Sequence, residues 1–404
     1  MTTNFYDAIV VGARCAGAPT AMLLAEQGHR VLLVDRSTFP SDTLSTLVIQ
    51  PQGVAALKRW GLYEDVAATG CPPIEQYRFD FGPLVISGRP RPIDGNATAI
   101  APRRTVLDKI LVDAAARAGA EVREGFTVDE VLFDDGAVVG IRGHVDGGSE
   151  VIERARVVVG ADGHNSRVAR AVEAARYHEK PVLENAFYTY WRDLPVDAFT
   201  TVIRGDRGFA AIPTNEDLTL LLVGCPFAQA GDFRRDVEAN YFEAVKREPE
   251  WADRLSAATR EGRFTGGGVP NFFRTPSGPG WVLVGDAGYT KDPITAQGIA
   301  NAFVAAEGVA AALGAVWAGE ASFEGAMGRY HADRDAAALP MYEFTTQLAT
   351  LEPPPPEMQE LFAAIAGNQP ATDAFVSVNA GTMSPPEFFD PDYLDRVLHP
   401  AEAR

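Results

Sequence analysis

The sequence predicts an α/β protein in which a nucleotide-binding domain is interleaved with a second domain built from a β-sheet. Residues 7–11 form a continuous apolar run that leads through a glycine-rich turn into an Ala/Leu-rich helix ending near Gln27. A second apolar run over residues 30–35 completes a β-α-β unit with parallel strands. Residues 70–99 and 171–274 instead show short alternating strands with many aromatic residues, which is typical of a separate sheet. At 404 residues, the chain is long enough for two domains.

The composition excludes several classes of protein. The chain is 46% hydrophobic and 22% charged, which is ordinary for a globular enzyme, and 54 acidic against 36 basic residues give a net charge of -18. That charge argues against nucleic acid as a partner. The three cysteines form no CxxC pair, which favours a reduced, cytoplasmic setting. We expect no secretion signal. We expect no integral membrane association, because no apolar stretch approaches 18 residues. We also expect no metal site, because no HxH or HExxH spacing occurs.

The first turn has the features of a dinucleotide site. The run from Gly12 to Gly17 matches G-x-G-x-x-G only in part, because Arg14 occupies the middle position. We expect its side chain either to point away from the ligand or to contribute its guanidinium. Asp35, at the end of the second strand, would accept the hydroxyls of an adenosine ribose and would repel a 2′-phosphate, so this site suits FAD or NAD. The candidate cofactor-binding residues here are Gly12, Arg14, Ala16, Gly17, Asp35 and Arg36.

Two further positions point to the same ligand. Arg104 lies in the first turn of a predicted helix, where a cation opposes the helix dipole, so a ligand anion is a fair explanation for it. Asp162-Gly163 follows the apolar strand 156–160 and precedes a Ser-x-x-x-Arg helix. We therefore interpret Asp162 as a cofactor contact.

Residues 281–303 form the stretch around which the site is organised. An apolar strand runs into Gly285 and Asp286, a loop contains Pro293, and a small-residue helix starts at Gly298. An Asp at a strand end can bind a sugar-like hydroxyl chain. A helix N-terminus offers backbone N–H groups and partial positive charge to an electron-rich carbonyl.

These motifs resemble those of the class A flavoprotein monooxygenases, the group of p-hydroxybenzoate hydroxylase. The likeness is carried by Gly285-Asp286-Ala287, Asp292-Pro293 and Ala296-Gln297-Gly298, together with the Arg-x-x-Leu-Asp run at Arg104 and the Asp162-Gly163 turn. The resemblance implies a non-covalently bound FAD, with Asp286 on the ribityl chain and Pro293 near flavin N5. It also implies that the pyrimidine end of the flavin faces the backbone of Ala296, Gln297, Gly298 and Ile299.

The resemblance further implies a glutathione-reductase-like Rossmann FAD-binding domain with an interleaved β-sheet substrate domain. We expect the FAD-binding domain to comprise residues 1–70, 100–175 and 276–350, and the substrate domain residues 71–99 and 176–275. After a proline-rich break at 353–356, residues 351–404 would form a helical capping segment. The sequence predicts no oligomeric state.

In this family the reduced flavin captures O₂ as a C4a-hydroperoxide and hydroxylates an electron-rich substrate. The resemblance therefore implies a monooxygenase that acts on a small, aromatic or polyketide-like molecule. NADH or NADPH would be the transient electron donor, and since one nucleotide fingerprint is visible, a separate flavin reductase is the alternative. Lys291, Asp292 and Pro293 are the catalytic candidates. Lys291 and Asp292 could instead pair with each other or with solvent.

Two other FAD-dependent functions remain open. One is a C=C reductase of the geranylgeranyl reductase type, and the other is a non-redox cyclase or isomerase in which the flavin serves as a scaffold. A halogenase is disfavoured, because its W-x-W-x-I-P signature aligns with residues 208–213, which read GFAAIP. Ser45 also stands where reductases and halogenases often have Cys.

Overall fold

The computed structural model describes residues 5–398, so the ends of the first and last predicted segments, 1–4 and 399–404, lie outside the described residues. The main sheet has the strand order β18-β19-β10-β1-β2-β7, and all pairings in this order are parallel except that of β18 with β19. A β8-β9 hairpin extends the sheet antiparallel from β10. The bounds are β1 (Phe5–Val11), β2 (Val31–Val34), β7 (Glu121–Arg123), β8 (Phe126–Asp134), β9 (Ala137–Val145), β10 (Val151–Gly160), β18 (Ser277–Gly278) and β19 (Trp281–Leu283).

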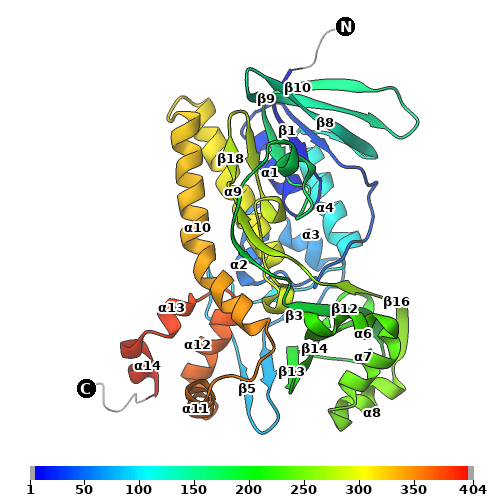
Figure 1. Cartoon of the computed structure of the whole chain (residues 1–404), viewed down its shortest axis with the longest axis vertical. Coiled ribbons are helices and arrows are strands. Elements are labelled where there is room, and N and C mark those ends of the chain that lie inside the picture. The colour runs from blue at the N-terminus through cyan, green and yellow to red at the C-terminus, as the bar shows by residue number, and fades with distance from the viewer. Residues whose placement is uncertain (1–4, 399–404) are drawn as a thin grey trace.

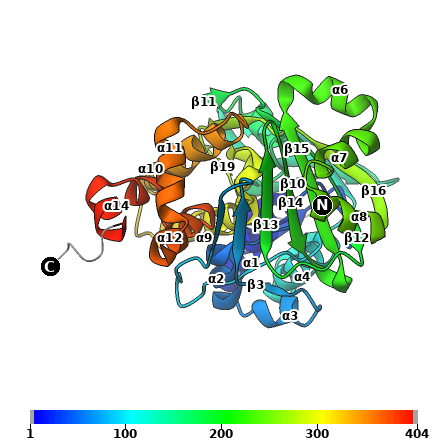
Figure 2. The same cartoon turned by 90° about the horizontal axis from the view of Figure 1, so that it is seen from below.

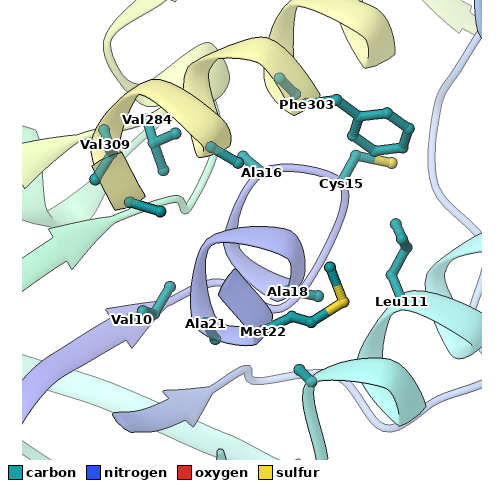
Figure 3. Packing of buried hydrophobic residues seen from close by; sticks show 14 of the residues in the cluster. Val10, Cys15, Ala16, Ala18, Ala21, Met22, Leu111, Val284, Phe303 and Val309 are labelled. Atoms are coloured by element: carbon teal, nitrogen blue, oxygen red, sulfur yellow. The ribbon is translucent and has the colours of Figure 1, made fainter. Parts of the chain in front are cut away.

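Helices cover one face of this sheet (Figure 1). They are α1 (Gly17–Glu26), α2 (Pro51–Arg59), α3 (Tyr63–Ala67), α4 (Arg104–Arg117), α9 (Gly298–Trp317) and α10 (Phe323–Leu348). Val10 on β1 and Met22 on α1 pack with Leu111 on α4 and Phe303 on α9 in one apolar cluster (Figure 3). The other face packs against the β8-β9 hairpin and α5 (Arg167–Ala171). Burial on both faces explains why the strands read as continuous Val/Leu/Ile runs.

The second sheet has the order β16-β12-β15-β14-β13-β4-β5 and is antiparallel except where β13 pairs with β4. One face packs against α6, α7 and α8, and the other against the C-terminal helices (Figure 2). The strands are β4 (Tyr77–Asp80), β5 (Val85–Gly88), β12 (Glu184–Arg192), β13 (Phe199–Arg204), β14 (Arg207–Pro213), β15 (Thr219–Pro226) and β16 (Thr259–Gly267); the helices are α6 (Ala230–Arg235), α7 (Val237–Val245) and α8 (Pro249–Ala257).

Smaller elements join these two sheets. A three-stranded sheet, β11-β17-β20, and a two-stranded one, β3-β6, complete the strands. The C-terminal helices lie against the second sheet beside β5, as Figure 1 also shows. The remaining bounds are β3 (Pro73–Ile74), β6 (Ala99–Ile100), β11 (Arg176–Lys180), β17 (Asn271–Arg274), β20 (Tyr289–Thr290), η1 (Asn215–Asp217), η2 (Phe227–Gln229), η3 (Gly285–Ala287), η4 (Pro293–Thr295), α11 (Pro356–Ile365), α12 (Gln369–Asn379), α13 (Pro385–Phe388) and α14 (Pro391–Leu398).

The predicted fold class is confirmed: a parallel nucleotide-binding sheet alternates along the chain with a second sheet. Strands β4 and β5 belong to the second sheet, and after them α4 leads the chain back to the first sheet. We therefore propose the domain boundaries predicted from the sequence, at residues 70, 100, 175, 276 and 350. The C-terminal segment is helical over α11 to α14.

One expectation about length was wrong. Helix α9 is a 20-residue helix with a mean hydropathy of 1.7, long and apolar enough to cross a membrane by length and composition alone. Its apolarity has another explanation here, because Phe303, Ala306 and Leu313 are buried in the cluster shared with α1. Such a core helix passes the same length and composition test as a membrane span.

Candidate active site

A single cavity of about 1590 Å³ runs from the end of β1 to the start of α9. It exceeds the roughly 300–1,000 Å³ that is usual for a small-molecule pocket, so it has room for a dinucleotide and a second molecule. Its lining includes every candidate site residue except Gly17. These residues are Gly12, Arg14, Ala16, Asp35, Arg36, Arg104, Asp162, Gly285, Asp286, Lys291, Asp292, Pro293, Ala296, Gln297, Gly298 and Ile299.

The turn after β1 leaves no space for side chains. Gly12 has a φ of +100°, and a Cβ there would lie 2.4 Å from the carbonyl oxygen of Ala161. A Cβ on Gly17 would lie 1.7 Å from the carbonyl oxygen of Gly12. Helix α1 begins at Gly17 without a side-chain cap. An uncapped helix N-terminus behind a close turn suits a pyrophosphate, so this end of the cavity fits FAD.

Arg14, at the cavity wall, is held by hydrogen bonds to other side chains. Its Nη1 donates to Asp108 Oδ2 at 2.5 Å, and its Nη2 donates to Ser41 Oγ at 2.9 Å. Arg104 donates to the same carboxylate through Nε at 2.9 Å and Nη2 at 3.0 Å. Asp108 is fully buried. The carboxylate of Asp108 therefore pairs with both guanidinium groups.

Asp35 is oriented by the backbone. Its Oδ2 accepts from Ala13 N–H at 2.7 Å, and its Oδ1 accepts from Ser37 N–H at 2.8 Å. A carboxylate oxygen has two lone pairs, so each oxygen can accept one more hydrogen bond from a ligand hydroxyl. Arg36 is exposed at the rim of the cavity. Ribose binding by Asp35 and Arg36 is our proposal.

Asp162 has a structural task of its own. Its Oδ1 accepts from Ser166 Oγ at 2.5 Å, and its Oδ2 accepts from the backbone N–H of Arg167 at 2.6 Å and of Val168 at 3.3 Å. The carboxylate thus stabilises the N-terminus of α5. We propose that Asp162 contacts FAD through its backbone, because Gly12 packs closely against its N–H.

Asp286 faces the open cavity. Among residues 5–398, no protein group donates a hydrogen bond to its carboxylate. Burial raises the pKa of Asp286, and the charges of His164, Arg104 and Lys291 oppose that rise. An acceptor without a protein donor is available to hydroxyl groups of a ligand such as a ribityl chain.

The start of α9 also faces the cavity. Ala296 has a φ of +49°, and Gln297 at the N-cap makes no side-chain cap. A Cβ added at Gly298 would meet nothing within 4 Å. The first-turn N–H groups therefore have no side-chain acceptor and suit an electron-rich ring edge.

Lys291 and Asp292 do not pair with each other. Lys291 Nζ donates to Gln297 Oε1 at 2.8 Å, and burial lowers the pKa of Lys291 to about 7. Asp292 Oδ1 accepts from Ile294 N–H at 3.1 Å, and burial raises the pKa of Asp292 to about 6. Both groups can therefore gain or lose a proton near neutral pH.

The sequence interpretation missed two sets of residues. Glu184 lies next to Asp292 and is buried at the start of β12. The sequence feature that could have identified it is a charged residue at the start of a strand rich in aromatic residues. Residues 380–385, after α12, line the far end of the cavity, and Gln297 Nε2 donates to the carbonyl of Asn379 at 3.1 Å. Nothing in the sequence pattern of that segment indicates a site.

Comparison with known proteins identifies a family and several relatives that bind FAD or are named as reductases and monooxygenases. A family model described as an FAD binding domain covers residues 6–345. The chain is 29% identical to a digeranylgeranylglycerophospholipid reductase of Methanocella arvoryzae over 74% of each chain. It is 28% identical to a 6-methylpretetramide 4-monooxygenase of Streptomyces rimosus over 72% of this chain and 71% of that one.

Solved structures share the fold. The myxobacterial chondrochloren halogenase CndH aligns with a TM-score of 0.79 at 24% identity, covering 98% of this chain and 93% of that one. The matched family, the cavity and the uncapped turns agree with the resemblance found in the motifs. The chain therefore belongs to the FAD-binding domain family and is an FAD-dependent flavoprotein oxidoreductase.

Proposed function

We propose that this flavoprotein is a monooxygenase that inserts one oxygen atom of O₂ into a small aromatic or polyketide-like substrate, with NADH or NADPH as the electron source. The observation that carries the proposal is the continuity of the cavity. The cavity that contains the candidate dinucleotide-site residues is also lined by Pro293 and by Tyr188, Leu222, Met341 and Met383. An apolar pocket beside the ring keeps water from the reacting atoms.

FAD, when bound, supplies the electron transfer and the activation of O₂. The protein contributes binding and electrostatics. We propose that Asp286 holds the ribityl hydroxyls and that the start of α9 directs N–H groups at the pyrimidine edge. Lys291 lies on the cavity wall, 5.7 Å from the ring centre of Tyr289, and can hold or release a proton near a substrate oxygen.

The test is stopped-flow reduction of the FAD-bound protein by NADH and by NADPH, with and without candidate phenols. A monooxygenase of this kind is expected to bleach faster when its substrate is present and to place ¹⁸O from labelled O₂ in the product. Bleaching only by added reduced flavin would instead indicate a separate reductase. Turnover without NAD(P)H or O₂ would overturn the proposal in favour of a cyclase or isomerase.

A second candidate is a C=C reductase. It is favoured by the similarity to the Methanocella arvoryzae reductase, which extends over 74% of each chain. The two functions differ in product mass, because a reductase adds two hydrogen atoms and consumes no O₂. The same measurement would detect a halogen in the product.

Lys291→Met is expected to lower the rate of substrate oxidation by about 100-fold, the size of a general acid–base contribution. Burial lowers the Lys291 pKa to about 7 in the folded protein, so the ammonium form prevails below that pH and the amine above it. The pH–rate profile should lose its inflection near neutrality in the variant, while FAD binding persists. Lys246→Met, at the exposed C-cap of α7, is the matched control. An unchanged profile in Lys291→Met would contradict the role.

A further inference from the structure

Two buried carboxyl groups meet behind the turn that carries Pro293. Glu184 on β12 is 5% exposed and Asp292 is 1% exposed. The two carboxyl groups are close enough for a hydrogen bond when one of them carries a proton. A carboxylate has no donor, so a hydrogen bond between two carboxyl groups requires that one of them carry a proton.

The surroundings fit a pair that shares a proton. Asp292 Oδ1 accepts from Ile294 N–H at 3.1 Å, whereas Asp292 Oδ2 is buried without a hydrogen-bond partner among the described residues. A proton on the neighbouring Glu184 would supply the missing donor. The Asp292 backbone N–H donates to Asn271 Oδ1 at 2.7 Å. A Cβ on Gly224 would lie 1.9 Å from Glu184 Oε1, so the glycine on β15 makes the room that Glu184 occupies.

No cation neutralises the pair within residues 5–398. Lys291, next to Asp292 in the chain, directs its ammonium to Gln297 Oε1 at 2.8 Å. On β15, the other titratable group that faces Glu184 is the Cys225 thiol. Across the neighbouring strands, Asn271 and Gly268 contribute no charge. The protonation of each carboxyl group therefore depends on the charge of the other.

Burial and the nearby Asp292 charge raise the pKa of Glu184 well above its usual range. Two carboxyl groups in contact titrate as a pair, because the first negative charge opposes the second. Between its two titration steps the pair then holds one proton, mainly on Glu184, and one negative charge, mainly on Asp292.

We propose that Glu184 is a positioning residue: as a neutral acid it donates a hydrogen bond to Asp292 and so fixes the turn from Lys291 to the start of α9 against the flavin ring. This inference rests on the proposed placement of the ring on that turn, and it is independent of the reaction that the ring performs. When the proton leaves at alkaline pH, two charges meet in a dry site, and the turn moves.

The matched experiment compares Glu184→Gln with the wild type and with Glu250→Gln, which removes an exposed charge on α8. Glutamine has the shape and the donor of the neutral acid, so the variant should bind FAD normally at neutral pH. In the wild type, the visible spectrum of bound FAD should shift between neutral and alkaline pH. That shift should be absent in Glu184→Gln and present in Glu250→Gln.

Infrared spectroscopy tests the shared proton without substrate or turnover. The wild type at neutral pH should show a C=O stretch of a protonated carboxylic acid that disappears in Glu184→Gln and persists in Glu250→Gln. Asp292→Asn serves as the second variant, in which Glu184 loses its carboxyl partner; the same band should shift or disappear. A band unchanged in both Glu184→Gln and Asp292→Asn would overturn the proposal, as would an alkaline spectral shift that survives in Glu184→Gln.

Stability should depend on pH in the direction that the pKa of Glu184 requires. The pKa of Glu184 is about 4.3 in the unfolded chain and is higher in the folded protein. The protonated Glu184 therefore contributes its full stabilisation at pH values below about 4.3, and this stabilisation is lost as the pH rises through the folded-state pKa. The thermal unfolding midpoint of Glu184→Gln should therefore exceed that of the wild type by a margin that grows toward alkaline pH. A constant difference across pH would contradict the raised pKa. Neither this result nor the spectra would change if the protein proved to be a reductase and not a hydroxylase.

Discussion

Gly12→Ala is expected to be purified without FAD and to bind added FAD at least about 100-fold more weakly than the wild type, because the backbone at this turn must approach the pyrophosphate. The new Cβ would lie 2.4 Å from the carbonyl oxygen of Ala161, and the φ of +100° disfavours any side chain. Relief of that overlap must separate β1 from β10, at the point where their carboxyl ends frame the cavity. Flavin fluorescence quenching measures the affinity.

The control for this variant is Gly328→Ala on α10, where an added Cβ meets nothing within 4 Å. It should retain FAD and be more stable by roughly 0.5–1 kcal/mol, since alanine loses less backbone entropy than glycine in a helix. Circular dichroism of both variants without FAD separates loss of the ligand from loss of the fold. Wild-type FAD affinity in a folded Gly12→Ala protein would show that the pyrophosphate does not approach this turn.

Asp108→Ala is expected to lower the free energy of unfolding by about 3–5 kcal/mol, the usual effect of breaking a buried ion pair from one side. Its carboxylate receives Arg14 at 2.5 Å and Arg104 at 2.9 and 3.0 Å, and Cys15 Sγ also donates to it at 3.4 Å. Without it, two guanidinium groups stay in a buried site with their main acceptor gone. Urea denaturation followed by circular dichroism measures the change.

Asp113→Asn on the same helix is the control, because its carboxylate is 45% exposed and pairs with Lys109. Its stability should differ from the wild type by at most about 0.5 kcal/mol. If Asp108→Ala were as stable as Asp113→Asn, the buried network would not hold α4 to the glycine turn.

The sequence predicted the parts of the fold whose physics is local. The β1-turn-α1-β2 unit and the helix starting at Gly298 each depend on hydrophobic period, turn residues or helix ends within a short segment. The family resemblance at residues 285–298 is likewise a local pattern, and it is confirmed by the matched family.

The parts that the sequence did not predict depend on contacts between distant segments. Arg14 and Asp108 stand in different motifs, and no spacing rule connects them. Glu184 opens β12, whereas Asp292 lies in the turn between β20 and η4. Each residue alone resembles a surface charge; only the folded chain shows that both members of each pair are buried together, where a charge without a partner is unstable.

The position of the C-terminal helices has a consequence for comparing this protein with its relatives. The matched family region ends at residue 345, whereas residues 380–385 line the cavity. Arg91, which follows β5, donates to the Thr382 carbonyl and to the Glu387 carboxylate. This part of the cavity wall therefore comes from residues outside the matched family region. A chimera that exchanges residues 346–404 with those of a relative would change this wall and leave the family motifs in place.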